Sequence, residues 1–431
     1  MKIDNSPARG MRDLLPATTA VRDRVLARIT EVYRRFGYQR IETPALEDIT
    51  RLQGGQGGEN EKLIFRVLRR GLDEQVTAGT SLSELIDLGL RFDLTVPLTR
   101  FYGQHLASLP LPFRSFQFGP VWRAERPQKG RYRQFYQCDI DLVGEASVLA
   151  EIELIEATTE AIAAIGLPGT AVRLSDRRFL SALADGAGVP QEAHNGLFIT
   201  LDKLDKIGWD GVCRELESRG LDEERIEHIR QTIESLRGID STKIVDQLSD
   251  SVPNLGEEVI TDLDTTIGGL RRLAEAREPN WEFDPTLVRG MGYYTGQIFE
   301  VGHPSTTSSL AGGGRYDRLI GRSLGKDVPA CGFSIGFERI VDLLGGAERA
   351  ESVALLYEND VVPADVLAAA RGLREQGHTV SAIRRSGKFG AQLGRLETWG
   401  FTALVHLKAD TAELPEPRRL GEDQRGIATS S

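Results

Sequence analysis

Apolar residues recur at helical spacing near the start of the chain and then give way to alternating patterns. In the segment 18–38, Val21, Val25, Ile29 and Val32 fall on one helical face, and Gly37 is placed to end the helix. The apolar runs that follow alternate with polar residues and lie near turn formers, which predicts neighbouring antiparallel strands. These runs are 62–68, 90–98, 113–125 and 135–144, and a long helix over 146–167 follows them.

The pattern changes twice more along the chain. Residues 178–259 are charged and helical, which predicts an insertion, and the clearest helix covers 223–236. Strand patterns return at 287–301, 309–321 and 330–344, and the last of these predicts a strand that runs into a helix. Beyond residue 352, short strands alternate with helices in βαβαβ order, which predicts a small, mostly parallel sheet. The tail has little apolar content, and we expect it to be partly disordered.

Composition limits the class of protein. A chain of 431 residues favours two or three domains, and the 40% hydrophobic and 27% charged residues are typical of a soluble globular protein. The net charge of -10 argues against a surface that binds nucleic acid everywhere, although a local basic patch could still do so. Three isolated cysteines indicate neither a zinc site nor a disulfide framework, and they fit a reducing cytoplasm. No apolar run is long enough to span a bilayer, and the N-terminus lacks the apolar region of a signal peptide.

One short stretch, RAERPQKGRYRQF at 123–135, concentrates positive charge in this acidic chain. It holds one acid, Glu125, among five cations: Arg123, Arg126, Lys129, Arg131 and Arg133. One interpretation is a solvated hairpin whose charges keep a sheet edge from pairing with other chains. The other is a site for polyphosphate or nucleic acid, because arginine binds phosphate oxygens through two parallel hydrogen bonds.

Acidic and amide side chains lie on the runs that flank this loop. If 90–98 is a strand, its alternation places Asp93 and Thr95 on one face, and the run 135–144 does the same for Gln137, Asp139 and Asp141. Such a group suits a pocket for a zwitterion next to a phosphate. The alternative is that these acids only form salt bridges with the neighbouring arginines.

The later strand runs add weaker signals. VRGMGYYTG contains Arg289, Tyr293 and Tyr294, which in isolation are typical of packing positions in a strand. The glycines of GGGRYD match neither of the common nucleotide motifs, and we expect them to let another backbone or a ligand approach a strand closely. Arg339 lies at the start of a predicted helix, where a cation opposes the helix dipole and an anionic ligand would explain it.

Taken together, these motifs resemble the histidyl-tRNA synthetase family of class II aminoacyl-tRNA synthetases. ETPALE, with Pro44, resembles the family's motif 1; FRSFQFGPVWRAERPQKGRYRQFYQCDIDLVG resembles motif 2; GFSIGFERIV resembles motif 3. LVRGMGYYTGQIFE and SLAGGGRYD resemble the two peptides that are specific to the histidine enzyme. One departure is Gly292, at a position where the family usually has an acid.

The resemblance implies an α+β fold: a class II synthetase core, in which an antiparallel sheet is flanked by helices, with a helical insertion and a C-terminal α/β domain like those that bind anticodons. The expected segments are 1–177 and 260–345 for the two parts of the catalytic core, 178–259 for the insertion and 346–431 for the C-terminal domain.

The resemblance also implies roles for individual residues. Arg289 and Arg123 would be catalytic, and Arg126 and Gln128 would contact the acceptor end of the tRNA. ATP would be bound by Arg123, Glu125, Arg131 and Arg339. Histidine would be bound by Asp93, Thr95, Gln137, Asp141, Arg289, Tyr293 and Tyr294. The expected partners are histidine, ATP with Mg²⁺, tRNA(His) and a second copy of the chain, with no zinc, no membrane and a cytoplasmic location.

Two alternatives stay open at this stage. The first is a non-catalytic relative such as the regulatory subunit of ATP phosphoribosyltransferase, but that protein generally lacks a C-terminal anticodon-like domain and has no need of phosphate-binding arginines. The second is a related enzyme that activates histidine for a different acceptor.

Overall fold

The computed structural model describes residues 4–53, 60–72, 80–127, 131–240, 243–274, 280–289, 292–345 and 351–421. The chain forms two compact units. Met1–Asp13 and Asp23–Leu344 form the first, and Leu14–Arg22 and Gly345–Ser431 form the second. The first helix, α1 (Pro16–Arg35), ends just before Gly37, whose φ of 83° lies in the left-handed region that favours glycine.

An eight-stranded sheet forms the centre of the first unit, in the order β1-β5-β6-β11-β10-β9-β7-β8. Its middle strands pair antiparallel, as predicted, whereas the end pairs β1–β5 and β7–β8 are parallel. The strands are β1 (Gln39–Arg40), β5 (Phe113–Trp122), β6 (Gln134–Val143), β7 (Ala171–Asp176), β8 (Asn280–Phe283), β9 (Gln297–His303), β10 (Thr306–Arg315) and β11 (Ala330–Ile335).

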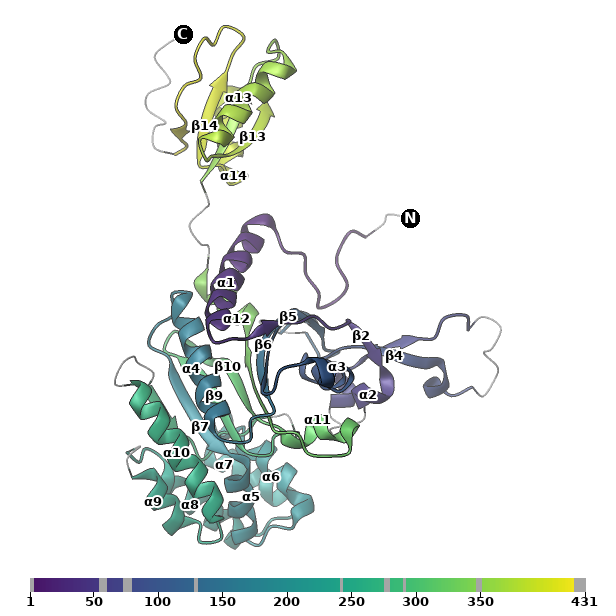
Figure 1. Ribbon diagram of the computed structural model, residues 1–431, viewed down its shortest axis with the longest axis vertical. Helices are drawn as coiled ribbons and strands as arrows, with labels where there is room; N and C mark the ends of the chain where they lie inside the picture. Colours follow the sequence, from purple (N-terminus) through teal and green to yellow (C-terminus); the bar gives the residue numbers. More distant parts are fainter. Residues whose placement is uncertain are drawn as a thin grey trace. The chain divides into compact units, whose positions relative to one another are not determined.

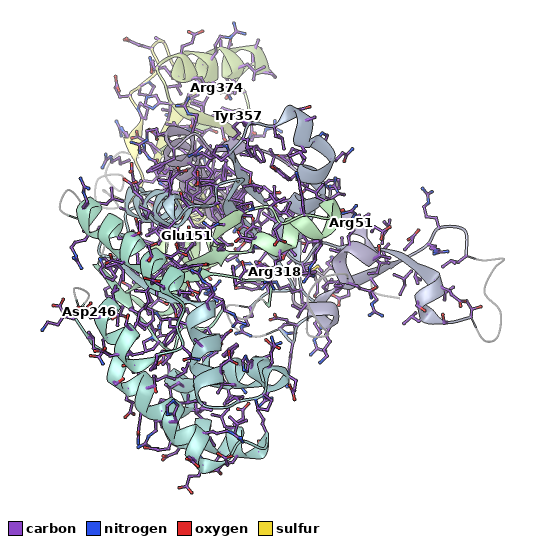
Figure 2. All side chains as sticks on the ribbon, turned by 60° about the horizontal axis from the view of Figure 1, so that its bottom comes forward. Arg51, Glu151, Asp246, Arg318, Tyr357 and Arg374 are labelled. Carbon is purple, nitrogen blue, oxygen red and sulfur yellow. The ribbon has the colours of Figure 1, made fainter. Side chains whose placement is uncertain are left out.

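Helices cover this sheet (Figure 1). The long helix α4 (Leu149–Ala164) packs on β6, β10 and β11 and buries Leu154, Ile155 and Ile162 completely. Glu151, on the same helix and labelled in Figure 2, receives two hydrogen bonds from Arg315 at 2.6 and 2.7 Å. A buried charge pair therefore joins α4 to the end of β10. The other helices of the core are α3 (Thr95–His105), α11 (Asp317–Leu324) and α12 (Phe337–Leu344).

A small three-stranded sheet, β2-β4-β3, lies beside the main one. It contains β2 (Leu46–Asp48), β3 (Phe65–Leu68) and β4 (Ile86–Leu90), with the short helix α2 (Ile49–Gln53) packed on β4. The single-turn 3-10 helices of this unit are η1 (Asn60–Leu63), η2 (Leu82–Leu85), η3 (Leu106–Ser108) and η4 (Gln191–Ala193).

The predicted strand over 90–98 is wrong. Strand β4 ends at Leu90, and α3 begins at Thr95. The carboxylate of Asp93 accepts a hydrogen bond from the backbone N–H of Val96 at 3.0 Å, which satisfies one of the unpaired donors at a helix start. An aspartate followed by a proline within the first turn is a helix-start signal, and it overrides the alternation of apolar residues.

The predicted helical insertion is present and gathers at one end of the first unit (Figure 1). Asp176 and Asp222 accept hydrogen bonds from the backbone N–H groups of Arg178 and Arg225 and so cap α5 and α8. The helices are α5 (Arg177–Gly186), α6 (His194–Leu201), α7 (Leu204–Ser218), α8 (Glu223–Leu236), α9 (Ile244–Ser251) and α10 (Glu257–Ala274). The predicted segment boundary between residues 259 and 260 falls inside α10.

The second unit contains the predicted βαβαβ pattern. Its sheet has the order β13-β12-β14-β15; the first three strands are parallel, and β15 pairs antiparallel with β14. Val353, Leu355 and Ala370 belong to its core. The elements are β12 (Ser352–Tyr357), α13 (Pro363–Glu375), β13 (Thr379–Arg384), α14 (Phe389–Thr398), β14 (Ala403–Leu407) and β15 (Arg418–Arg419). Residues 422–431, the end of the tail for which we expected disorder, lie outside the described residues.

Among the described residues, no helix is both long enough and apolar enough to cross a membrane.

Candidate active site

A pocket of about 620 Å³ opens over β6, β10 and β11. Every residue predicted to bind ATP or histidine lines it. These residues are Asp93, Thr95, Arg123, Glu125, Arg131, Gln137, Asp141, Arg289, Tyr293, Tyr294 and Arg339. Arg126 is exposed and does not line the pocket, and Gln128 lies outside the described residues.

The acidic wall of the pocket is built from two elements. Gln137, Asp139 and Asp141 share one face of β6, as their spacing predicted, and all three line the pocket. Asp93 and Thr95 reach the same pocket from the turn that starts α3, and not from a strand. Among the described residues, no ion pair joins Asp93, Asp139 or Asp141 to an arginine, so the salt-bridge interpretation does not account for them.

Burial makes these acids hard to ionise. It raises the pKa of Asp93 to about 6 and that of Asp141 to about 7, because a charged carboxylate loses its hydration in this wall. Burial and the neighbouring Asp141 also raise the pKa of Asp139 well above its usual range. The wall would therefore be stabilised in its charged form by a cation that enters the pocket.

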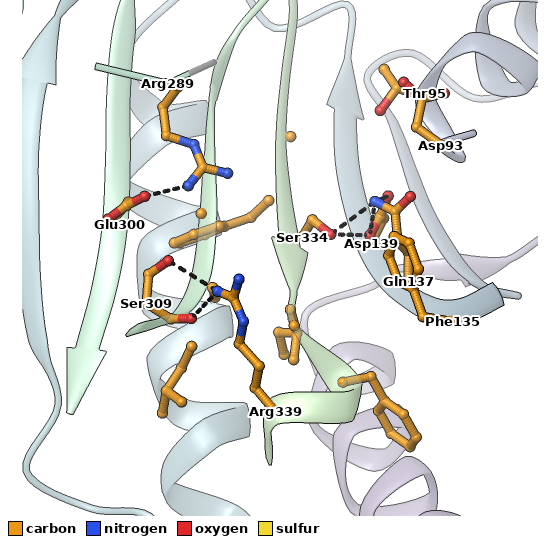
Figure 3. Close-up of a pocket in the computed structure, with 18 of the residues that line it drawn as sticks. Asp93, Thr95, Phe135, Gln137, Asp139, Arg289, Glu300, Ser309, Ser334 and Arg339 are labelled. Carbon is orange, nitrogen blue, oxygen red and sulfur yellow. Dashed lines mark hydrogen bonds and ion pairs between the residues drawn. The ribbon is translucent and has the colours of Figure 1, made fainter. Parts of the chain in front are cut away.

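Several buried polar atoms in this wall lack a partner within the described part of the chain. They are Oδ2 of Asp93, Oε1 of Gln137 and Oδ2 of Asp141. Gln137 donates its Nε2 to Asp139 at 3.2 Å, and Ser334 donates its hydroxyl to Asp139 at 2.5 Å (Figure 3). Because the amide nitrogen is already used, the amide oxygen of Gln137 is the group left to accept from a ligand. Leaving such acceptors unpaired costs stability, so their arrangement indicates a ligand that carries hydrogen-bond donors.

Asp141 is oriented by a residue that the sequence did not single out. The hydroxyl of Tyr316 donates to Oδ1 of Asp141 at 2.5 Å, which leaves Oδ2 as the unpaired acceptor. The ring of Tyr316 packs edge-on against Tyr293, and Tyr293 packs in the same way against Tyr294. This part of the pocket therefore combines flat aromatic walls with one fixed carboxylate oxygen.

The peptide that contains Arg289, Tyr293 and Tyr294 is not part of a strand. The predicted strand over 287–301 is wrong for its first half, because β9 begins only at Gln297. Residues 290–291 lie outside the described residues. Because this peptide is not a strand of the sheet, it can place three large side chains in one pocket. The strict alternation of a strand would not allow this.

The glycines of β10 make room for Arg289. A Cβ atom on Gly312 would lie 2.4 Å from Cζ of Arg289, and one on Gly313 would meet the backbone oxygen of Gly332. The guanidinium thus lies against a strand without side chains, where we expected another backbone or a ligand for the GGGRYD motif. Its Nη1 donates to Glu300 at 2.5 Å, and its buried Nε has no partner among the described residues.

The arginines of the pocket, including Arg289, repel one another. Desolvation lowers the pKa of Arg339, and the nearby Arg131, Arg289 and Arg123 lower it further, whereas Glu300 acts in the opposite direction. Arg339 is held by the backbone oxygen of Ser309, which accepts from its Nη1 at 2.7 Å (Figure 3). Cations collected in this way are stabilised when an anion with several charges binds between them.

The arginines of the basic stretch 123–135 have different roles. Arg123 enters the pocket, where its Nε donates to the backbone oxygen of Phe92 at 3.0 Å and its guanidinium lies over the ring of Phe135. Arg133 fastens the loop instead, by donating its Nε to the backbone oxygen of Glu125. The only ion pair of Arg131 among the described residues is a 3.8 Å contact with Glu125 on a largely exposed side chain, and such a contact is weak.

Sequence patterns missed Tyr316, Ser334, Glu300 and Ser309, all of which line the pocket. Ser334 pairs with Asp139 across β11 and β6, and Glu300 pairs with Gly312 across β9 and β10. The alternation within each strand does not give this register. These residues could be found only once the pairing of the strands was known. In the described part of the chain, no group of three or more His, Cys, Asp or Glu side chains could hold a metal ion.

Comparisons with known proteins match most of the chain. A family model described as histidyl-tRNA synthetase matches residues 10–340. A histidine--tRNA ligase of Leifsonia xyli subsp. xyli is 47% identical over 424 residues, which cover 94% of this chain and 96% of that protein. The crystal structure of a histidyl-tRNA synthetase from Nostoc sp. PCC 7120 is 28% identical, with a TM-score of 0.75 over 95% of this chain and 93% of that one.

A further solved structure is described as an ATP phosphoribosyltransferase regulatory subunit/histidyl-tRNA synthetase from Bacillus halodurans. It superposes with a TM-score of 0.77 over 95% of this chain and 100% of that one, at 21% identity. At that identity the likeness concerns the fold alone, so it does not choose between a catalytic and a regulatory function.

Proposed function

Because the chain belongs to the histidyl-tRNA synthetase family, we propose that it is a histidine--tRNA ligase, which activates histidine with ATP and transfers it to the 3′ end of tRNA(His). In the first step a carboxylate oxygen of histidine attacks the α-phosphorus of ATP. The bond to the bridging oxygen of pyrophosphate breaks, and pyrophosphate leaves with that electron pair. In the second step a hydroxyl of the terminal ribose attacks the histidyl carbonyl, loses its proton, and AMP leaves.

One observation carries the proposal: unpaired buried acceptors and crowded arginines line the same pocket. A free amino acid brings an ammonium group to the acceptors, and ATP brings phosphates to the arginines. The reaction joins a carboxylate to a phosphate, so two like charges must approach one another. Fixed cations that are already in place lower the free energy of that approach without having to reorganise.

The arginines would act on different parts of ATP. Arg123, aimed by the Phe92 carbonyl, would hold the α-phosphate, and Arg339 would hold the adenine and γ-phosphate end. Arg289 would lie near the α-phosphate and the histidine carboxylate, at a position that other class II enzymes leave to a metal ion. Glu125 and Arg131 would complete the ATP site. ATP would enter as its magnesium complex, as a substrate.

The acidic wall would recognise histidine. Asp93, Thr95 and Gln137 would accept from the α-ammonium group, because Asp93 and Gln137 each offer a buried unpaired oxygen. The unpaired Oδ2 of Asp141 would accept from one N–H of the imidazole, and Tyr294 would meet its other nitrogen. Tyr293, which packs against Tyr294, would form the aromatic wall beside the ring.

The remaining roles concern the tRNA and the assembly. Arg126 and Gln128 would contact the acceptor end, and the exposed side chain of Arg126 is compatible with that role. The second unit would bind the anticodon. We also propose that the enzyme is a cytoplasmic homodimer.

The regulatory alternative is not favoured. The relatives from Leifsonia xyli subsp. xyli and Porphyromonas gingivalis, which are 47% and 35% identical to this chain, are both described as histidine--tRNA ligases. An enzyme that activates histidine for a different acceptor would share the whole pocket, so only an assay with tRNA separates it from the ligase.

The proposal is tested by histidine-dependent exchange of pyrophosphate into ATP. We expect exchange with histidine alone among the amino acids. The Asp246→Asn variant should match the wild type, because Asp246 is exposed on α9 of the insertion (Figure 2). Pure, folded protein that gives no exchange above background would refute the proposal.

A further inference from the structure

Arg289 stands on a segment that has no regular structure to hold it. It lies between β8, which ends at Phe283, and β9, which starts at Gln297. A guanidinium that acts on a developing charge must nevertheless be held within a fraction of an ångström. Its position therefore has to come from side-chain contacts.

Glu300 supplies the strongest of these contacts. Its Oε1 accepts from Nη1 of Arg289 at 2.5 Å, and both side chains are largely withdrawn from solvent, with 14% and 23% of their surface exposed. Glu300 itself lies on β9 in the main sheet, directly opposite Gly312 of β10. The missing side chain at Gly312 leaves the space in which the two groups meet.

The second oxygen of Glu300 is also fixed. It accepts from Nη2 of Arg173 on β7 at 2.9 Å, and Nη1 of Arg173 donates to Asp284 at 3.2 Å. Asp284 in turn accepts from the backbone N–H and the hydroxyl of Thr286, at 2.8 and 2.6 Å. Asp284, Arg173, Glu300 and Arg289 thus form a chain of alternating charge, which we call the clamp.

The clamp begins and ends on the same irregular segment. Asp284 is the residue after β8, and Arg289 lies five residues further along the chain. The two middle members, Arg173 and Glu300, belong to neighbouring strands that pair antiparallel. Two rigid strands therefore hold both ends of the segment 284–289. A fifth group, Asp205 of α7, lies 3.6 Å from Arg173, but it is 62% exposed and contributes little.

From this geometry we propose that Glu300 is a positioning residue, which holds the Arg289 guanidinium at the reacting centre through the clamp. Glu300 does this without contacting the phosphate. The inference rests on the proposed function, since it assumes that Arg289 acts in adenylate formation.

The test is a double-mutant cycle with Glu300→Gln and Arg289→Ala, read by the kcat of pyrophosphate exchange. In the wild-type background, Glu300→Gln should lower kcat by about 10- to 100-fold, because a small displacement of a catalytic group has an effect of this size. In the Arg289→Ala background the same change should alter kcat by less than about 2-fold, because Glu300 acts only through Arg289. A loss of the same size in both backgrounds, or no loss in either, overturns the inference.

Controls separate this role from a general effect on folding. Glu234→Gln removes an exposed carboxylate on α8, outside the pocket and the clamp, and should leave kcat unchanged. If Glu300→Gln does not fold, Glu300→Asp keeps the charge, withdraws it from Arg289 by one methylene, and should follow the same cycle. A crystal structure of the variant gives a readout independent of activity: the guanidinium should leave its place against Gly312, and an unmoved Arg289 contradicts the inference even if the wild type proves to be inactive.

Discussion

Replacing Asp93 with asparagine should stabilise the unliganded protein while it abolishes histidine activation. The Asp93 carboxylate is 2% exposed, and its Oδ2 has no partner among the described residues. Asparagine keeps an oxygen that can accept from the N–H of Val96, so the start of α3 should survive. The substitution removes only the buried charge, which the free protein must desolvate and which histidine would neutralise.

The magnitude follows from the pKa of Asp93. Burial raises it from 3.8 to about 6, and a difference of about 2 units between the unfolded and folded states corresponds to about 3 kcal/mol. Because the folded-state pKa is the higher one, the stability from protonated Asp93 is fully present below about pH 4 and is lost as the pH rises through about 6. For a unit of this size the unfolding entropy is about 0.7 kcal/mol/K, so the variant should melt up to about 4 °C higher at about pH 8.

Thermal melting of the wild type and the variant, without ligand, at several pH values between about 4 and 8 measures this difference. The variant should gain stability relative to the wild type as the pH rises, and it should show neither histidine-dependent exchange nor a shift of its melting temperature with histidine. The Asp246→Asn control should follow the wild type throughout. A variant that is less stable than the wild type at high pH would show that the buried charge of Asp93 does not destabilise the free protein. A variant that retains exchange would show that this charge is not needed to bind histidine.

Four other outcomes follow from the pocket and the core. Arg289→Ala should slow adenylate formation by orders of magnitude in single-turnover assays while equilibrium binding of ATP survives, because this cation acts mainly in the transition state. The kcat/KM for histidine, corrected for ionisation of the free amino acid, should fall as the pH drops through about 7; burial raises the pKa of Asp141 to about 7, and the protonated acid loses its acceptor. Arg315→Met should destabilise the first unit by about 3–5 kcal/mol in denaturant titrations, because it leaves Glu151 buried without its partner. The apparent affinity for tRNA should weaken steeply with added salt in filter-binding assays, and a salt-independent affinity would exclude phosphate contacts.

One wall of the pocket could be predicted from the sequence because its residues lie on a long strand with clear alternation. Gln137, Asp139 and Asp141 share a face of β6 for that reason alone. The glycines of β10 were expected to allow a close approach to the strand by a backbone or a ligand, and the group that approaches is the side chain of Arg289. In both cases a local rule of strand geometry was enough.

The sequence failed where local rules compete or where distant parts meet. The segment at Asp93 alternates like a strand, but the helix-start signal of Asp93 and Pro97 prevails. The partners of the pocket residues, such as Tyr316 for Asp141 and Glu300 for Arg289, lie on other segments of the chain, and their contact depends on how those segments pack around the sheet. No periodicity within one segment carries that information.

Aminoacylation of total tRNA with each amino acid in turn tests the central claim most directly. Histidine alone should become attached to tRNA, the product should be tRNA(His), and the Asp93→Asn variant should make none. Attachment of another amino acid, or histidine-dependent exchange of pyrophosphate without any charged tRNA, would contradict the claim.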